Sequence, residues 1–195
     1  MKSKFLFILL IAFCTSCSSD YSPKPKAYFH IDLPNPVYSE FTDFPFFKFS
    51  ISNQAFVEEL KDAPAGMKEK NGMGFNLIYP RLYAKVYCSY FRINKHDFSD
   101  FMEESRQMVY VREIRAKGVK EIEYIHPEQK VYGLVYEIQG DAASPVQFVI
   151  SDSINSFFRG SLYFDSYYNR DSIAPVLEYI NKDIQFIIES FRWKQ

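Results

Sequence analysis

Alternating apolar and polar positions dominate the C-terminal half of the chain. Four strand-length runs cover residues 119–125, 131–139, 146–151 and 157–165, and turn residues such as Pro127, Gly140 and Asn155 separate them. Short alternating runs divided by turns are typical of an antiparallel meander. The same period occurs earlier, at residues 44–52, 75–79 and 81–93, so we predict strands there as well. Residues 63–74, with one proline and three glycines, are predicted to form a loop.

Two segments have the helical period instead. In residues 97–117 apolar side chains recur every three or four positions, Asp97 or Ser99 can cap the start, and Gly118 supplies a left-handed stop. In residues 172–192 an apolar stripe continues to Phe191, with Asp171 or Ser172 as the cap. Each stripe needs a hydrophobic surface to cover it, and the sheet is the surface available. We therefore predict an α+β domain, an antiparallel sheet with two amphipathic helices packed on one side of it.

The first 16 residues have the pattern of a signal peptide. Lys2 and Lys4 precede an uncharged apolar run over residues 5–13. A run of about 9 to 13 apolar residues is too short to span the roughly 30 Å of bilayer hydrocarbon as a helix. Residues 1–16 are therefore predicted to direct export and to be removed.

Cys17 follows two small residues, Thr15 and Ser16. This order resembles the bacterial lipobox, which implies that the Cys17 thiol receives a diacylglycerol and that cleavage before it creates an acylated N-terminus. More than one acyl chain makes membrane anchoring stable. Cys14 is a poorer candidate because the bulky Phe13 precedes it. The remaining alternative is an ordinary signal peptide with an incidental cysteine.

Residues 17–27 combine the predicted lipidated cysteine with a stretch that contains Pro23 and Pro25. Prolines at this density favour an extended path of about 3.1 Å per residue, so we predict a semi-rigid tether. Residues 28–195 then form a single α+β domain, because a mature chain of about 180 residues can bury a sizeable core. Within it, residues 27–33 are expected to form a first strand or an extended segment docked on the domain.

Charge and composition narrow the function. Loss of residues 1–16 removes two of the 23 basic residues and none of the 24 acidic ones, which leaves a formal charge of −3. This balance gives no broad attraction for nucleic acid, so nucleic-acid binding is not expected. The 20 Phe and 15 Tyr favour a sheet with large buried side chains, and they also leave aromatic groups for the surface.

Few residues offer catalytic chemistry. Cys88 is the one thiol left after removal of the signal peptide and lipidation of Cys17, and its place in an alternating run favours a buried structural residue over a nucleophile. The histidines and the candidate carboxylates are far apart and lie next to turns: His30, His96, His126, Asp32, Asp141, Asp152 and Asp165. We therefore expect a protein that is not an enzyme and has no cofactor or metal site.

An ordered set of short strings resembles the gliding motility lipoprotein GldD family of the Bacteroidota. The strings lie at residues 23–34 (PKPKAYFHIDLP), 79–80 (YP), 84–90 (AKVYCSY), 130–136 (KVYGLVY), 144–148 (SPVQF), 159–164 (RGSLYF), 174–177 (APVL) and 191–193 (FRW). The resemblance implies an envelope lipoprotein that is required for gliding and is linked to type IX secretion. It implies no catalytic residues. The order of elements also resembles the PsbP-like sandwich, a likeness of fold that implies no function.

Two hypotheses follow. The first is a structural or assembly lipoprotein that is anchored in the membrane through Cys17 and binds other gliding and type IX secretion proteins through an aromatic surface. The second is a periplasm-facing module that binds a lipid or glycan. A deep apolar pocket favours the second, and a filled core with a flat aromatic patch favours the first. Because Asp20 is only a weak acidic signal after Cys17, we expect the domain to face the periplasm and not the cell surface. We expect the anchor in the outer membrane, with the inner membrane as the alternative.

Overall fold

The computed structural model describes residues 32–60, 67, 72–110, 116–140, 142–165 and 170–194. Its strands are β1 (Tyr38–Phe41), β2 (Phe47–Ser52), β3 (Phe56–Glu59), β4 (Gly72–Tyr79), β5 (Ala84–Arg92), β6 (Ala116–His126), β7 (Val131–Gly140), β8 (Val146–Ser151), β9 (Ser156–Phe164) and β10 (Arg192–Trp193). Its helices are α3 (Phe98–Tyr110) and α4 (Arg170–Ser190), and two 3₁₀ turns, η2 (Pro80–Leu82) and η3 (Pro127–Gln129), close hairpins.

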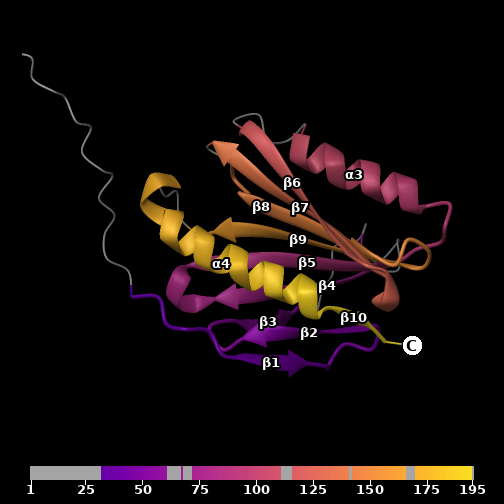
Figure 1. Ribbon diagram of the computed structural model, residues 1–195, viewed down its shortest axis with the longest axis horizontal. Coiled ribbons are helices and arrows are strands. Elements are labelled where there is room, and N and C mark those ends of the chain that lie inside the picture. Colours follow the sequence, from indigo (N-terminus) through magenta and orange to yellow (C-terminus); the bar gives the residue numbers. More distant parts are fainter. Residues whose placement is uncertain are drawn as a thin grey trace, which may run out of the picture.

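Seven strands form one antiparallel sheet in the order β3-β4-β5-β9-β8-β7-β6. The β4–β5 hairpin joins the meander β6 to β9 where β5 pairs with β9 along its whole length, from Ala84 opposite Phe164 to Arg92 opposite Ser156. A second, small sheet has the order β1-β2-β10. Because β10 pairs with β2, the C-terminal end of the chain lies beside the first strands (Figure 1).

The large sheet buries apolar residues on both faces. Every residue of β8 is buried, and neighbouring residues point to opposite sides. Phe148 and Ile150 belong to the core that contains α4, whereas Val149 packs with Phe101 of α3. Therefore α4 covers one face, here named the inner face, and α3 covers the opposite, outer face (Figure 1). The antiparallel α+β fold with two packed helices is confirmed, but the expectation that both helices lie on one side is wrong, because each apolar face needs its own cover.

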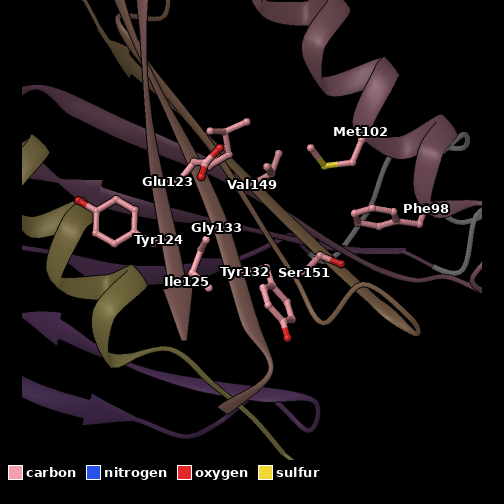
Figure 2. Close-up of a pocket in the computed structure, with 10 residues that line it drawn as sticks. Phe98, Met102, Glu123, Tyr124, Ile125, Tyr132, Gly133, Val149 and Ser151 are labelled. Atoms are coloured by element: carbon pink, nitrogen blue, oxygen red, sulfur yellow. The ribbon is translucent and has the colours of Figure 1, made fainter. Parts of the chain in front are cut away.

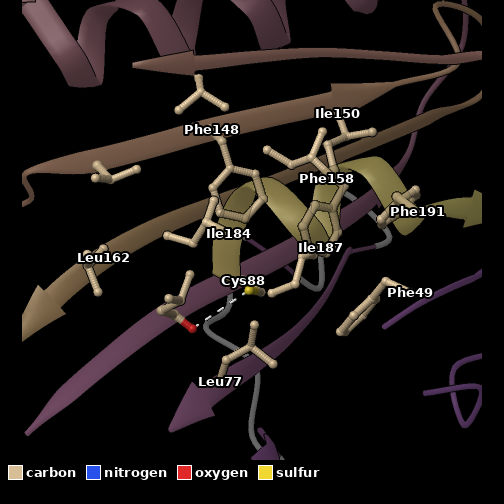
Figure 3. Close-up of a cluster of buried hydrophobic side chains, with 14 of the residues drawn as sticks. Phe49, Leu77, Cys88, Phe148, Ile150, Phe158, Leu162, Ile184, Ile187 and Phe191 are labelled. Carbon is tan, nitrogen blue, oxygen red and sulfur yellow. Dashed lines mark hydrogen bonds between the residues drawn. The ribbon is translucent and has the colours of Figure 1, made fainter. Parts of the chain in front are cut away.

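The main core lies between the inner face and α4 (Figure 3). The rings of Phe47 and Phe49 in β2 stack on Phe191, with centroids 5.4 and 6.4 Å apart. The sheet contributes Phe75, Phe148, Phe158 and Leu162, and α4 contributes Val176, Ile180, Ile184, Ile187 and Ile188. The high phenylalanine content therefore serves mainly to fill this interior.

Most of the predicted strands are confirmed. The strands β6 to β9 form the predicted meander, and β2, β4 and β5 coincide with the earlier runs. Residues 72–74, which were predicted as part of a loop, instead begin β4; of the remainder of that loop only Met67 is described. Of residues 27–33 only Asp32 and Leu33 are described, and neither is in a strand, although Leu33 packs against the main core.

The helix boundaries differ from those predicted. Asp97 directly precedes α3, where its carboxylate accepts a hydrogen bond from the Asn94 side-chain amide at 2.6 Å, and Ser99 lies within the helix. The predicted end at Lys117 is wrong, because Ala116 already begins β6 and Gly118 lies inside that strand without a positive φ. Residues 111–115 lie outside the described residues. At the other helix, α4 starts at Arg170, so Asp171 and Ser172 lie within the helix and do not precede it.

Candidate functional site

A pocket on the outer face lies between α3 and the β6 edge of the sheet. The C-terminal end of α3 packs over β7, where Val109 contacts Tyr136 and Ile138. Near the other end of the helix, Phe101 packs on Phe157 of β9. The helix therefore crosses the sheet obliquely, and its N-terminal half diverges from β6 and leaves part of the outer face uncovered.

The pocket has a volume of about 250 Å³. Figure 2 shows Phe98 and Met102 of α3 on one side, and residues of β6, β7 and β8 on the other. The complete lining is Phe98, Met102, Glu123, Tyr124, Ile125, Tyr132, Gly133, Leu134, Val149 and Ser151. Pockets for small molecules typically measure about 300–1,000 Å³, so this one better suits one or two apolar side chains.

Glu123 and Ile125 of β6 form the part of the pocket rim nearest the sheet edge. Ile125 is 59% exposed, and its cross-strand neighbour Tyr132 is 38% exposed. The Glu123 carboxylate has no hydrogen bond or ion pair within the described residues. The pocket therefore combines exposed apolar side chains with an uncompensated negative charge.

The neighbouring acid, Glu121, has a different role. The Tyr110 hydroxyl donates a hydrogen bond to its Oε1 at 2.5 Å, and this bond raises the pKa of Tyr110. Because Tyr110 is the last residue of α3, the contact fixes that end of the helix to β6. The N-terminal half of α3 borders the pocket, and the helix is held in position by this contact outside the pocket.

A second exposed aromatic group lies on the half of the outer face that α3 does not cover. Phe56 of β3 is 50% exposed and Tyr87 of β5 is 47% exposed. The Tyr87 ring meets Tyr163 of β9 edge to face, with centroids 5.4 Å apart. Exposed apolar groups that gather on one face are typical of protein interaction surfaces. Exposed aromatic side chains are therefore present on the outer face.

Asp183 is buried in the inner layer, a feature that the sequence analysis did not identify. The side chain is 1% exposed, and the Tyr38 hydroxyl donates a hydrogen bond to its Oδ1 at 2.5 Å. Its Oδ2 and the buried Tyr79 hydroxyl have no hydrogen-bond partner within the described residues. Burial raises the pKa of Asp183, and burial together with the Asp183 charge raises the pKa of Tyr79. This group connects α4 with β1 and is remote from the outer pocket.

The predicted structural role of Cys88 is confirmed. The side chain is 2% exposed, its Sγ lies 3.7 Å from the carbonyl oxygen of Val86, and burial raises the pKa of its thiol. Figure 3 shows it among the apolar side chains of the main core. A thiol in this environment stays protonated and is a poor nucleophile.

The remaining candidate residues are not brought together. His96 is exposed and His126 is half-buried at the end of β6. The Asp152 carboxylate accepts hydrogen bonds from the backbone N–H groups of residues 154, 155 and 156, which is the predicted turn role. His30 and Asp141 lie outside the described residues.

Other findings concern binding and anchoring. Within the described ranges, no group of three or more His, Cys, Asp or Glu side chains could hold a metal ion. Neither helix in that part of the chain is long and apolar enough to cross a membrane. Cys17, the signal peptide and the tether lie outside the described residues.

Sequence reasoning did not identify Glu123 and Ile125 as site residues. The available signal was the alternation in residues 121–125, which places Glu121, Glu123 and Ile125 on one strand face. An isoleucine on an otherwise acidic face indicates either burial under another element or an exposed contact. Only the oblique path of α3 shows that the contact is exposed.

Comparison with known proteins gives the family. The model of the family described as gliding motility lipoprotein GldD matches residues 18–193, which include every described strand and helix. The match begins one residue after Cys17. No curated protein matches the chain significantly. The resemblance found in the sequence is thus confirmed, and the chain belongs to the gliding motility lipoprotein GldD family, whose members are motility-associated, lipid-anchored envelope proteins.

Proposed function

We propose that the protein is a non-enzymatic assembly component of the gliding apparatus, linked to type IX secretion, that acts by binding other envelope proteins. The family match over residues 18–193 is the observation that carries this proposal. The surface supports a binding role, because exposed aromatic side chains occupy both parts of the outer face.

The chemistry of the interior supports a role without catalysis. Burial raises the pKa of Cys88 and of Tyr79 well above their ordinary values, and both side chains are enclosed in the main core, away from the open pocket. At the pocket itself the polar groups are mainly Glu123 and Ser151, together with the tyrosine hydroxyls. A lone carboxylate beside apolar side chains suits recognition of a partner more than proton transfer, which needs a positioned reacting group.

Anchoring through Cys17 is part of the same proposal. A diacylglycerol on Cys17 and a proline-rich tether over residues 18–27 would hold the folded domain within about 30 Å of the membrane, at about 3.1 Å per residue. We place the anchor in the outer membrane with the domain in the periplasm. There it would meet other proteins of the gliding and secretion apparatus.

A periplasm-facing module for a lipid or glycan is the second candidate function. The apolar lining of the outer pocket favours it, but a volume of about 250 Å³ is below the usual range for such ligands. Native mass spectrometry of the purified protein tests this alternative. A bound lipid or sugar that is lost when Met102 is replaced by Asp would support it, and an empty pocket would argue against it.

Gene deletion in a gliding bacterium tests the main proposal. We expect the deletion strain to form non-spreading colonies and to lose secretion of surface adhesins, and we expect a plasmid copy of the gene to restore both. Loss of spreading with normal secretion would refute the link to type IX secretion. Normal spreading would refute the role in gliding.

A further inference from the structure

The edge of the large sheet at β6 is open along an 11-residue strand. β6 is the last strand in the sheet order, and it pairs with β7 on one side. In the described part of the chain, no backbone hydrogen bond joins its other side to any element. Alternate N–H and C=O groups of β6 therefore point outward without a partner there.

Natural sheets usually protect such an edge with a short strand, a bulge, a proline, charged side chains, especially lysine, or a covering element. The one register irregularity of β6 lies at its start, between Ala116 and Gly118, so the rest of the strand is regular. Lys120 lies on the inner-face side, where its Nζ is 3.4 Å from Oε2 of Glu137. The outer side of the strand thus presents Glu121, Glu123 and Ile125 with no basic residue between them.

The open edge and the outer pocket are adjacent. Glu123 and Ile125 line the pocket and belong to the last strand before the edge (Figure 2). A strand added to β6 would lie about 4.8 Å away, with the side chains opposite these two residues at a Cβ distance of about 5 Å. One such side chain would reach the apolar pocket beside Ile125, and the one two residues along would face Glu123.

We propose that an extended segment of a partner protein adds to β6 as an eighth strand of the sheet. Its backbone pairs with the open edge, an apolar side chain enters the pocket between Ile125 and α3, and a Lys or Arg two residues away pairs with Glu123. Strand addition of this kind takes its affinity from main-chain hydrogen bonds and its specificity from pockets for alternate side chains. The inference rests on the proposed function, for which it specifies the kind of partner.

A synthetic peptide provides a defined probe. The end-blocked sequence Thr-Lys-Thr-Leu-Thr-Lys-Thr places leucine and both lysines on one face and threonine on the other, in either strand direction. Binding of the fluorescent peptide to the mature lipoprotein in lipid nanodiscs is measured by anisotropy. We expect saturable binding that weakens about tenfold or more when the leucine is replaced by aspartate.

Protein variants locate the contact. Glu123→Lys should weaken binding of the lysine peptide about threefold and strengthen binding of a peptide with glutamate in place of both lysines. Glu59→Lys makes the same change of charge at an exposed position of β3, at the opposite edge of the sheet. This matched control should change neither affinity. Equal effects of the two variants would contradict a contact at Glu123.

Backbone chemistry distinguishes strand addition from simple pocket filling. N-methylation of one set of alternate peptide amides should abolish binding, and methylation of the other set should leave it intact, because only one set faces β6. Amide hydrogen exchange should slow in residues 116–126 on binding. Equal tolerance of both methylated peptides, or protection confined to another element, would overturn the proposal.

The remaining outcomes identify other occupants or none. Protection of β6 that depends on protein concentration without peptide would show that a second copy of the chain occupies the edge, and it would overturn the proposed partner. Absence of saturable binding would do the same. These results are independent of the deletion experiment, so the strand-addition site can fail while the role in gliding stands, and the reverse also holds.

Discussion

Asp183 is an ionisable residue that the fold buries in an apolar layer. A carboxyl group on the apolar stripe of α4 is desolvated, and the hydrogen bond from Tyr38 satisfies only one of its oxygens. Desolvation opposes the charged form, which is why the folded state raises the pKa of Asp183 above its ordinary value. At neutral pH the buried carboxylate therefore stabilises the fold less than its neutral form would.

The raised pKa of Asp183 determines how this residue makes stability depend on pH. A raised folded-state pKa means that the native state holds the Asp183 proton more tightly, so its contribution to the free energy of unfolding is largest below the ordinary pKa of 3.8. That contribution is lost as the pH rises through the folded pKa. We expect wild type to gain stability relative to Asp183→Asn as the pH falls from 7 toward 4. Urea unfolding of both proteins measures this, with the exposed Glu178→Gln on the same helix as the charge control. A difference that does not change with pH would contradict the prediction.

Close packing against Phe148 requires a glycine at position 160. A Cβ built on it would lie 2.3 Å from the ring of Phe148, which is itself buried against Phe158. We expect Gly160→Ala to lower the free energy of unfolding by about 1–3 kcal/mol, because the ring has no room to move. Denaturant unfolding measures the change.

Gly118 gives the matched control for Gly160. It also lies within a strand, but its added Cβ would meet nothing closer than 3.6 Å, the Oε1 of Gln139. Gly118→Ala should leave the free energy of unfolding unchanged or raise it by about 0.4–1 kcal/mol through the unfolded-state entropy. Equal destabilisation by the two alanines would show that the contact with Phe148 is not the cause.

Two hairpins of the large sheet share one turn design. In both, a proline begins a 3₁₀ turn and a residue in the left-handed region ends it: Pro80 and Tyr83 in one, Pro127 and Lys130 in the other. The Lys130 N–H donates a hydrogen bond to the Pro127 carbonyl oxygen at 3.1 Å. Proline presets the first dihedral angle, so these turns fix the register of the adjoining strands.

Glycine in place of a residue with left-handed backbone angles is predicted to stabilise the protein. Lys130 has φ 52° and ψ 41°, a conformation that is unfavourable for a side chain by about 1–2 kcal/mol. Lys130→Gly should raise the free energy of unfolding by about 0.5 kcal/mol after the larger chain entropy of glycine is subtracted. Glu128→Gly, in the same turn but without a positive φ, should lower it. Thermal unfolding compares them, and destabilisation by both glycines would contradict the strain at Lys130.

At the scale of elements, the long periodic segments could be predicted from sequence and the short ones could not. The strands β6 to β9 each bury a recognisable face, whereas β10 has two residues and exists only because it pairs with β2. The end of α3 was misplaced because residues 111–117 continue a helical pattern up to Gly118, but pairing with β7 draws Ala116 into a strand. Tertiary pairing here outweighs local propensity.

The site was less predictable than the fold because it depends on how elements cross. The pocket is lined by residues of α3, β6, β7 and β8, and no local pattern brings them together. A sequence signal did exist for helices on both faces, since residues 148–150 are three consecutive apolar residues where a strand with one buried face would alternate. Asp183 also had one, because it follows Ile180 by three positions and precedes Ile187 by four.

The whole molecule is a layered sandwich in which the small sheet shares the main core. Phe47 of β2 is fully buried, and its ring contacts Phe75 and Phe158 of the large sheet as well as Phe191. The two sheets and α4 are therefore expected to unfold as one cooperative unit.

Phe47→Ala tests this cooperativity. We expect a loss of about 3–5 kcal/mol in the free energy of unfolding, with a single transition in both fluorescence and circular dichroism. Phe56→Ala removes the same ring from a half-exposed position in β3 and should have a much smaller effect. A separate early transition in Phe47→Ala would show that the small sheet unfolds independently.

The lipid anchor is the feature on which the proposed role in the envelope depends most. Replacement of Cys17 by alanine in the chromosome of a gliding bacterium, with Cys14→Ala as the matched control, allows colony spreading and membrane fractionation to be measured in the same cells. We expect Cys17→Ala protein to be absent from the membrane fraction, to take up no labelled palmitate and to leave the colonies non-spreading. The Cys14→Ala protein should remain in the membrane fraction and take up palmitate, and its colonies should spread. Spreading colonies whose Cys17→Ala protein carries no lipid would contradict a function that requires the anchor.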